Sequence, residues 1–201
     1  MKIKILLYLI LTMNLFYLKA QRIYDPIIYF KTQTGFTLEI DSYKNNDNKY
    51  VVSITERYSD IITGKYKSMT VYIFESKIIE FEKEIDEVYN YLIKWHNTAI
   101  ENKISYLNKD LPFKSNSLVN PFCTDNIYTP SNKNVKYNFN FINNYSNINI
   151  QIKDNDTYNS CSTYWPLTKD DIINFKNEVK RMIELQKEYD RKSKEVDNLF
   201  K

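Results

Sequence analysis

The chain has 201 residues, which is enough for one domain, and 43% of them are hydrophobic, which is enough to build a core. Lys and Arg outnumber Asp and Glu by 28 to 25, and Lys2, Lys4 and Lys19 account for the whole excess. Without residues 1–20 the chain is formally neutral, so its composition does not indicate the basic surface that binds nucleic acid or anionic membranes, although a local basic patch is the alternative.

Residues 1–20 are typical of a secretory signal. Two lysines open the chain, an apolar run extends from Ile5 to Leu18, and Ala20 is a small residue at the expected cleavage site. The apolar run is shorter than the ~20 residues of a membrane-spanning helix. We therefore expect a secreted or periplasmic protein with no membrane attachment after cleavage. An uncleaved anchor that holds a structural envelope protein is the alternative, because Leu18 is bulky for its place before the cut.

The first half of the remaining chain, residues 21–104, predicts several strands and then a helix. From Ser76 to Ile100 apolar residues recur at spacings of three, four and seven, which predicts a long amphipathic helix. Before it, strands are predicted at residues 36–41, 50–56 and 66–74, with a hairpin turn at 44–49. Residues 26–33 are interpreted as a first strand, with an extended arm as the alternative.

An irregular loop is predicted over residues 105–134, because this segment is rich in Pro, Ser and Asn. It contains Cys123, and the only other cysteine of the chain is Cys161. In an exported protein two such distant cysteines predict a disulfide, which would stabilise the fold by about 4 kcal/mol on the chain-entropy model. Two free buried thiols are the alternative.

The second half, residues 135–201, predicts the same order of elements. Residues 135–141 and 147–152 alternate in polarity on either side of a turn at 143–146, which predicts a hairpin. Thr168 is a natural N-cap, and Asp170 and Asp171 follow where the helix dipole favours negative charge, so a second amphipathic helix is expected to start here.

Two ten-residue segments at the helix starts resemble each other. SKIIEFEKEI at 76–85 and DDIINFKNEV at 170–179 share Ile-Ile, Phe and Glu at an offset of 94 residues. We interpret the chain as one α+β domain, residues 21–201, with antiparallel sheets, two long amphipathic helices and a tandem hairpin–helix repeat. Coincidence in a chain rich in Ile and Glu is the alternative to duplication.

The composition removes most catalytic machinery. Gly35 and Gly64 are the only glycines, so the glycine-rich loops that bind nucleotides are absent. His96 is the only histidine, which excludes sites built from several histidines, and its place on the first helix suggests a structural role. We expect no cofactor and no metal site. A catalytic pair of carboxylates is not excluded, because such pairs have no fixed spacing.

The sequence therefore favours a non-catalytic protein that binds another protein, such as an enzyme inhibitor or the immunity partner of a toxin. A carboxylate-based hydrolase of envelope or extracellular polymers is the alternative, and nucleic acid or nucleotide ligands are not expected. Aromatic residues on loops near the disulfide would form the contact surface, since Tyr and Trp are favoured at interfaces. These candidates, each of which has a core or sheet-capping role as its alternative, are Tyr128, Tyr145, Tyr158, Tyr164 and Trp165.

Overall fold

The computed structural model describes residues 26–59, 66–123, 134–153 and 162–198. Residues 26–186 form one compact unit. Residues 187–198 belong to a second unit and carry ion pairs one helical turn apart, such as Arg191 with Glu195. The predicted secretory signal lies outside the described residues. Among the described helices, none has the length and apolar character needed to cross a membrane.

Sheet A is antiparallel and carries its apolar side chains on one face. Ile40, Ile54 and Val71 are opposite one another on three neighbouring strands, and all three are fully buried. Alternation along each strand places polar side chains on the other face. The spatial order is β1 (Ile27–Lys31), β2 (Thr37–Lys44), β3 (Tyr50–Ser59), β4 (Tyr66–Phe74) and β6 (Val119–Cys123).

Sheet B is also antiparallel and is built around one hairpin. Asn143 and Asn144 turn the chain with φ values of 47° and 69°, the left-handed conformation that two-residue hairpin turns require and that Asn tolerates. The spatial order is β5 (Tyr106–Lys114), β7 (Asn134–Ile142), β8 (Tyr145–Lys153) and β9 (Ser162–Leu167). The two sheets and two helices confirm the α+β class.

Three strands were not predicted, and all three lie at or near sheet edges. The prediction that residues 105–134 are irregular is wrong for β5 and β6. The prediction that Tyr164 and Trp165 lie on a loop is wrong as well, because both belong to β9. Each of these strands contains a proline, at positions 112, 121 and 166, and each is the outermost strand on its side of a sheet. Proline cannot donate a backbone hydrogen bond, so it is tolerated in edge strands and weakens the strand pattern there.

The two helices begin at residues 78 and 169. A 3-10 turn, η1 (Glu75–Lys77), leads into α2 (Ile78–Glu101), and α3 (Lys169–Asn198) follows β9. Thr168 caps α3 as predicted, because its hydroxyl accepts a hydrogen bond from the Asp171 amide at 3.3 Å. The Asp171 carboxylate in turn accepts the Thr168 amide at 2.9 Å, which completes a reciprocal capping box.

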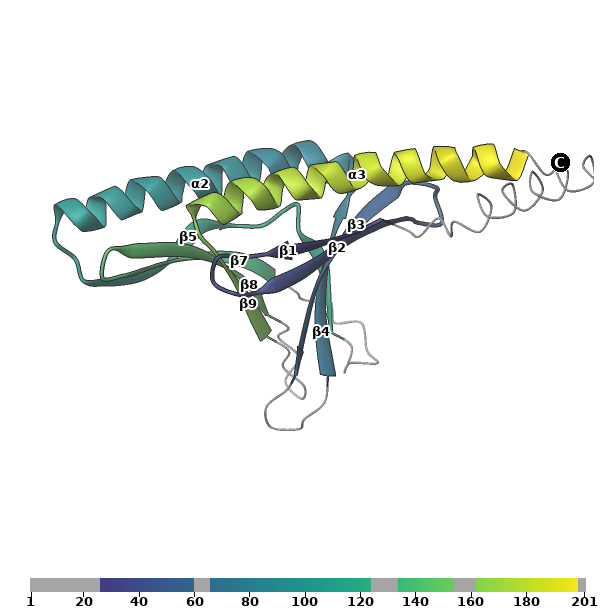
Figure 1. Cartoon of the computed structure of the whole chain (residues 1–201). Helices are drawn as coiled ribbons and strands as arrows, with labels where there is room; N and C mark the ends of the chain where they lie inside the picture. Colours follow the sequence, from purple (N-terminus) through teal and green to yellow (C-terminus); the bar gives the residue numbers. More distant parts are fainter. Residues whose placement is uncertain (1–25, 60–65, 124–133, 154–161, 199–201) are drawn as a thin grey trace, which may run out of the picture. The chain divides into compact units, whose positions relative to one another are not determined.

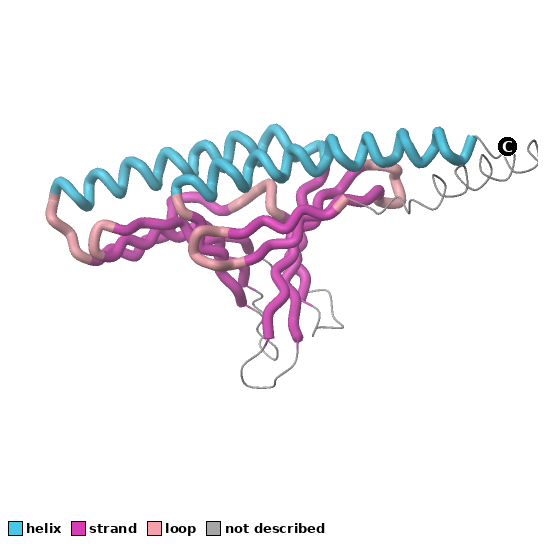
Figure 2. Tube along the Cα trace, in the orientation of Figure 1, coloured by secondary structure: helices cyan, strands magenta, loops and turns pink. Residues whose placement is uncertain are grey.

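Each helix contacts the sheet formed mainly by the other half of the chain (Figures 1 and 2). Helix α2 follows the strands of sheet A and contacts β4 of that sheet, but it packs mainly on β5, β7 and β8 of sheet B. Trp95 and Phe139, for example, lie 5.5 Å apart between ring centroids. Helix α3 follows the strands of sheet B, and its Phe175 contacts Phe30 of β1 at 5.7 Å. Neither half therefore covers its own sheet alone.

The helices α2 and α3 run antiparallel where they meet. Phe81 and Phe175 are both fully buried, and their rings contact each other edge to face at 5.9 Å. Two ion pairs flank this contact and consist of Glu82 with Lys180 and Asp86 with Lys176. The acidic members of both pairs come from α2 and the basic members from α3, so the helix contact is charge-complementary.

The predicted disulfide lies outside the described side chains. Cys123 is the last residue of β6 and its backbone pairs with Met69, but its side chain and all of Cys161 are not described. The link between these cysteines stays a prediction.

Candidate functional site

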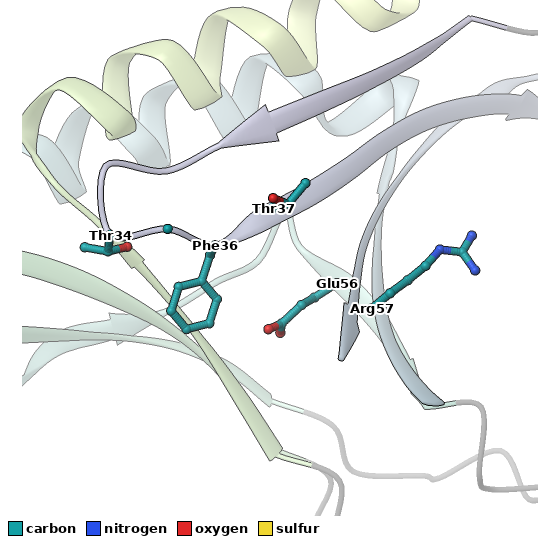
Figure 3. A pocket seen from close by; sticks show the side chains of 6 residues that line it. Thr34, Phe36, Thr37, Glu56 and Arg57 are labelled. Carbon is teal, nitrogen blue, oxygen red and sulfur yellow. The ribbon is translucent and has the colours of Figure 1, made fainter. Parts of the chain in front are cut away.

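An open pocket of about 330 Å³ lies where the β1–β2 turn meets strand β3 (Figure 3). Gly35 forms the tip of the turn with φ at +91°, a conformation that side chains with a Cβ rarely adopt. The lining residues are Thr34, Gly35, Phe36, Thr37, Glu56 and Arg57. The pocket thus combines a turn, a buried carboxylate and an aromatic ring.

The turn is fixed in place by hydrogen bonds to the other half of the chain. The Thr34 hydroxyl donates to the Pro166 carbonyl at 3.0 Å. The Gln33 amide donates to the Asp171 carboxylate at 3.0 Å, at the start of α3. Because these contacts link sheet A to β9 and α3, one rim of the pocket is held rigidly by both halves.

Glu56 is the unusual residue of the pocket, because it occupies an apolar position of its strand. Val52, Ile54 and Glu56 project from the same face of β3, and Glu56 stands opposite Leu38 on one side and Met69 on the other. Its side chain is only 7% exposed. A carboxylate at such a position is costly unless hydrogen bonds or a cation compensate its charge.

Two donors from sheet B hold one oxygen of this carboxylate. Glu56 Oε2 accepts a hydrogen bond from Trp165 Nε1 at 2.9 Å and another from the Thr163 hydroxyl. Both donors lie on β9, more than a hundred residues along the chain. Trp165 is fully buried, which agrees with its alternative role as a core aromatic, and its only polar atom is used in this contact.

Arg57 follows Glu56 directly but projects from the opposite face of the strand. Its guanidinium makes two hydrogen bonds of 3.0 Å to the two oxygens of Glu39. Figure 3 shows the Arg57 side chain extending away from the Glu56 carboxylate. The hydrogen bonds and charge of Glu39 raise the pKa of Arg57, so this guanidinium stays charged and bound to its own partner.

One aromatic side chain, Phe36, lines the pocket, and it contacts a second aromatic ring. The Phe36 ring is half-buried and lies 5.9 Å from the ring of Tyr164, which is 55% exposed. In Figure 3 the Glu56 side chain extends from β3 toward the Phe36 ring. The predicted binding residue Tyr164 therefore contacts Phe36, a lining residue of the pocket, while Thr163 and Trp165 on either side of it bind Glu56. The sequence patterns did not point to Phe36 or Glu56.

The remaining predicted binding residues lie elsewhere. Tyr145 begins β8 and is 49% exposed, and partial burial together with the nearby Asp171 carboxylate raises its pKa. Tyr128 and Tyr158 lie outside the described residues. His96 packs against Phe141 and shares a 3.0 Å hydrogen bond with Ser146, a contact that holds α2 on sheet B.

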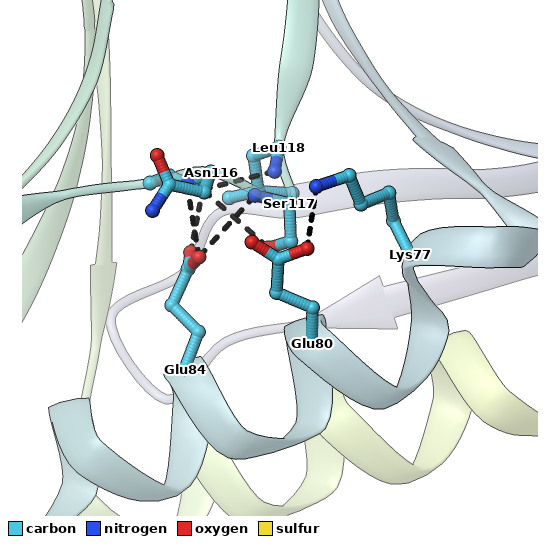
Figure 4. Close-up of polar contacts among 7 residues, drawn as sticks. Lys77, Glu80, Glu84, Asn116, Ser117 and Leu118 are labelled. Atoms are coloured by element: carbon cyan, nitrogen blue, oxygen red, sulfur yellow. Dashed lines mark hydrogen bonds and ion pairs between the residues drawn. The ribbon is translucent and has the colours of Figure 1, made fainter.

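A second buried carboxylate, Glu84 of α2, fixes the turn between β5 and β6 (Figure 4). One of its oxygens accepts the Ser115 and Tyr137 hydroxyls, and the other accepts the backbone amides of Asn116 and Ser117 at 3.0 and 3.2 Å. Burial, followed by the charge of Glu84, raises the pKa of Tyr137 well above its usual value, so its hydroxyl stays protonated and donates.

The chemistry of the pocket favours binding over acid–base catalysis. Of the six lining residues only Glu56 carries a carboxylate, whereas glycosidase-type hydrolysis requires two facing the same bond. Within the described parts of the chain, no group of three or more His, Cys, Asp or Glu side chains could hold a metal ion.

Comparison with known proteins does not assign the chain to a family. No family model matches the chain, and no curated protein or solved structure is similar to it.

Replacing Glu84 with Ala is expected to lower the free energy of unfolding by about 3 kcal/mol, because four donors lose their shared acceptor and two of them are buried. Urea denaturation measures this change. Glu87→Ala, one turn away on an exposed part of α2, is the matched control and should change stability by less than about 0.5 kcal/mol. Equal effects of the two substitutions would contradict the structural role of Glu84.

Replacing Thr163 with Val is expected to destabilise the protein by about 1–2 kcal/mol, because this isosteric change removes one of the two donors to the buried Glu56 carboxylate. The exposed Thr37 on the neighbouring pocket wall provides the control, and Thr37→Val should have little effect. Thermal unfolding of the two variants beside the parent chain makes the comparison, and a Thr163→Val chain as stable as the parent would rule out the contact.

Proposed function

We propose that the protein is an exported, non-catalytic binding protein that holds another protein through the surface around the Glu56 pocket. An enzyme inhibitor or the immunity partner of a toxin fits this physical type. The observation that carries the proposal is the open pocket whose single carboxylate is anchored by Trp165 and Thr163. Its aromatic lining residue, Phe36, contacts the exposed Tyr164.

The composition of this surface supports protein binding. Tyr side chains provide a large contact area with little loss of conformational entropy, and they are enriched at protein interfaces. The rim is rigid because the turn bonds to both β9 and α3, so little ordering would be needed on association. The alternative, a carboxylate-based hydrolase, requires a second carboxylate that the residues lining the pocket do not supply.

The proposal places this function outside the cytoplasm, in a secreted or periplasmic location. The support for this location is the signal-like character of residues 1–20 and the pair of distant cysteines. The neutral charge of the remaining chain fits a protein partner better than nucleic acid.

Affinity capture from the native compartment tests the proposal. The immobilised chain should retain one protein in stoichiometric amount, and Tyr164→Ala should weaken that binding at least about tenfold, since an interfacial Tyr is a common hot spot. Tyr106→Ala is the matched control, because Tyr106 is similarly exposed at 63% but begins β5. Turnover of a glycan or peptide by the purified chain would overturn the proposal in favour of a hydrolase.

We also propose that the two halves are a tandem repeat with an approximate two-fold relation. Each half consists of four strands followed by a helix, with β6 as the exception that joins the sheet of the first half. Phe175 stands 94 residues after Phe81, the offset found in the sequence, and the two rings touch. The contact between equivalent residues is what a two-fold relation requires near its axis.

The flanking ion pairs support the same relation. Lys176 and Lys180 stand 94 residues after Glu82 and Asp86. Glu82 pairs with Lys180 and Asp86 pairs with Lys176, so each position contacts the equivalent of the other, as in an isologous interface. Because the charges differ in sign between the halves, the arrangement favours pairing of unlike halves over like ones.

Separate chains of residues 21–103 and 104–201 provide the test of this arrangement. We expect neither fragment to unfold cooperatively alone, and the mixture to form a folded one-to-one complex, because each helix covers the sheet of the other half. Charge reversal in the first fragment (Glu82→Lys with Asp86→Lys) should weaken the complex about tenfold or more through like-charge repulsion.

The reciprocal change in the second fragment (Lys176→Glu with Lys180→Glu) should restore the association, which analytical ultracentrifugation can measure. Two fragments that fold independently, or a charge-reversed pair that is not restored, would contradict the proposed exchange.

A further inference from the structure

We propose that the Glu56 pocket receives a cationic side chain, the ammonium of a lysine or the guanidinium of an arginine, from the protein partner. This inference rests on the proposed function and specifies the chemistry of its contact. It starts from the hydrogen bonds of the Glu56 carboxylate, which leave one oxygen without a donor among the described residues.

The two buried carboxylates of the protein differ in how completely their oxygens are used. Glu84 receives two donors on each oxygen, four in all, and so has no capacity left for a ligand. Glu56 receives both of its donors on Oε2. No described residue donates to its Oε1, and Glu56 lines an open pocket.

The described part of the chain does not supply a cation for this oxygen. Arg57 is bound to Glu39 through both of its hydrogen bonds and projects from the other face of β3. Lys67 stands opposite Tyr58 on the neighbouring strand, two positions from Met69, the residue that faces Glu56. Among the described contacts, none joins Lys67 to the Glu56 carboxylate, whose bound donors are Thr163 and Trp165. A buried negative charge without a counter-charge is unfavourable, so an external cation would gain from binding here.

The walls of the pocket fit a cation on an aliphatic stem. The Phe36 ring, with Tyr164 beside it, offers an aromatic face, and aromatic faces attract ammonium and guanidinium groups. Thr34, Gly35 and Thr37 complete the lining, and its one cationic residue, Arg57, is bound to Glu39. A volume of about 330 Å³ is enough for a Lys or Arg side chain and not for a folded segment.

The Trp165 indole N–H is a built-in reporter of this site, because it donates to the same carboxylate. The chain has two tryptophans, so nitrogen-15–proton spectra contain two indole signals, and Trp95→Phe assigns them. Nα-acetyl-arginine amide and Nα-acetyl-lysine amide are the probes. Nα-acetyl-citrulline amide, which has the shape of the arginine probe but no charge, is the control.

We expect the cationic probes to shift the Trp165 signal saturably in the millimolar range and to leave the Trp95 signal in place. Glu56→Gln keeps an oxygen for Trp165 and removes the charge, so it should weaken binding by at least about tenfold. Asp86→Asn removes one negative charge from an exposed ion pair on α2, outside the residues that line the pocket, and should leave binding of the probes unchanged. Phe36→Ala, which leaves the buried carboxylate untouched, should weaken binding severalfold and serves if Glu56→Gln does not fold.

Equal binding of the citrulline probe, or no response of Trp165 to either cation, would overturn the inference. So would undiminished binding by a folded Glu56→Gln variant or by Phe36→Ala. The proposed function is tested separately. Cation binding without a captured protein would support the cation site and contradict the proposed function. If a partner is captured and Glu56→Gln does not weaken its binding, the proposed function would be supported and the cationic contact would be contradicted.

Discussion

The structure depends on the burial of two sheet faces that neither half of the chain can cover alone. Each sheet carries an apolar face that the helix of the other half helps to cover, so that Phe81, Phe175 and Phe30 meet in one core. Since hydrophobic burial is the main favourable term in folding, this exchange ties the halves together more strongly than their surface ion pairs do. The position of the β1–β2 turn against β9, and with it the pocket, follows from the same exchange.

Two carboxylates within this apolar core show how one residue type can serve different purposes. Glu84 satisfies the turn at residues 115–117, where the chain crosses from sheet B to sheet A, and its hydrogen bonds are internal. The hydrogen bonds that Glu56 accepts from described residues all reach one of its two oxygens, Oε2. A charge at an apolar strand position lowers stability unless hydrogen bonds or a counter-charge compensate it. Residues of this kind often serve binding rather than folding.

Sequence patterns predicted the central strands well because two-residue alternation reflects burial on one face. The predicted strand at 66–74 coincides with β4, and the hairpin of β7 and β8 was found within two residues at its ends. The edge strands were missed because Pro112, Pro121 and Pro166 obscure the pattern. The alternation of Val52, Ile54 and Glu56 along β3 indicates that Glu56 faces inward, a signal present in the sequence. Its contacts with Thr163 and Trp165 could not be predicted in this way, because they join distant parts of the chain. Helical periodicity shows that a face is apolar and does not show which sheet it covers.

The exchange of helices also has a consequence for how such a chain matures. Synthesis delivers the chain from its N-terminus, so α2 emerges well before β7 and β8, two of the strands on which it packs. Until they arrive, the part of its apolar stripe that packs on sheet B stays exposed, and exposed apolar surface of this kind favours aggregation. Burial of the α2 stripe is therefore completed late in synthesis, after β8 has been made.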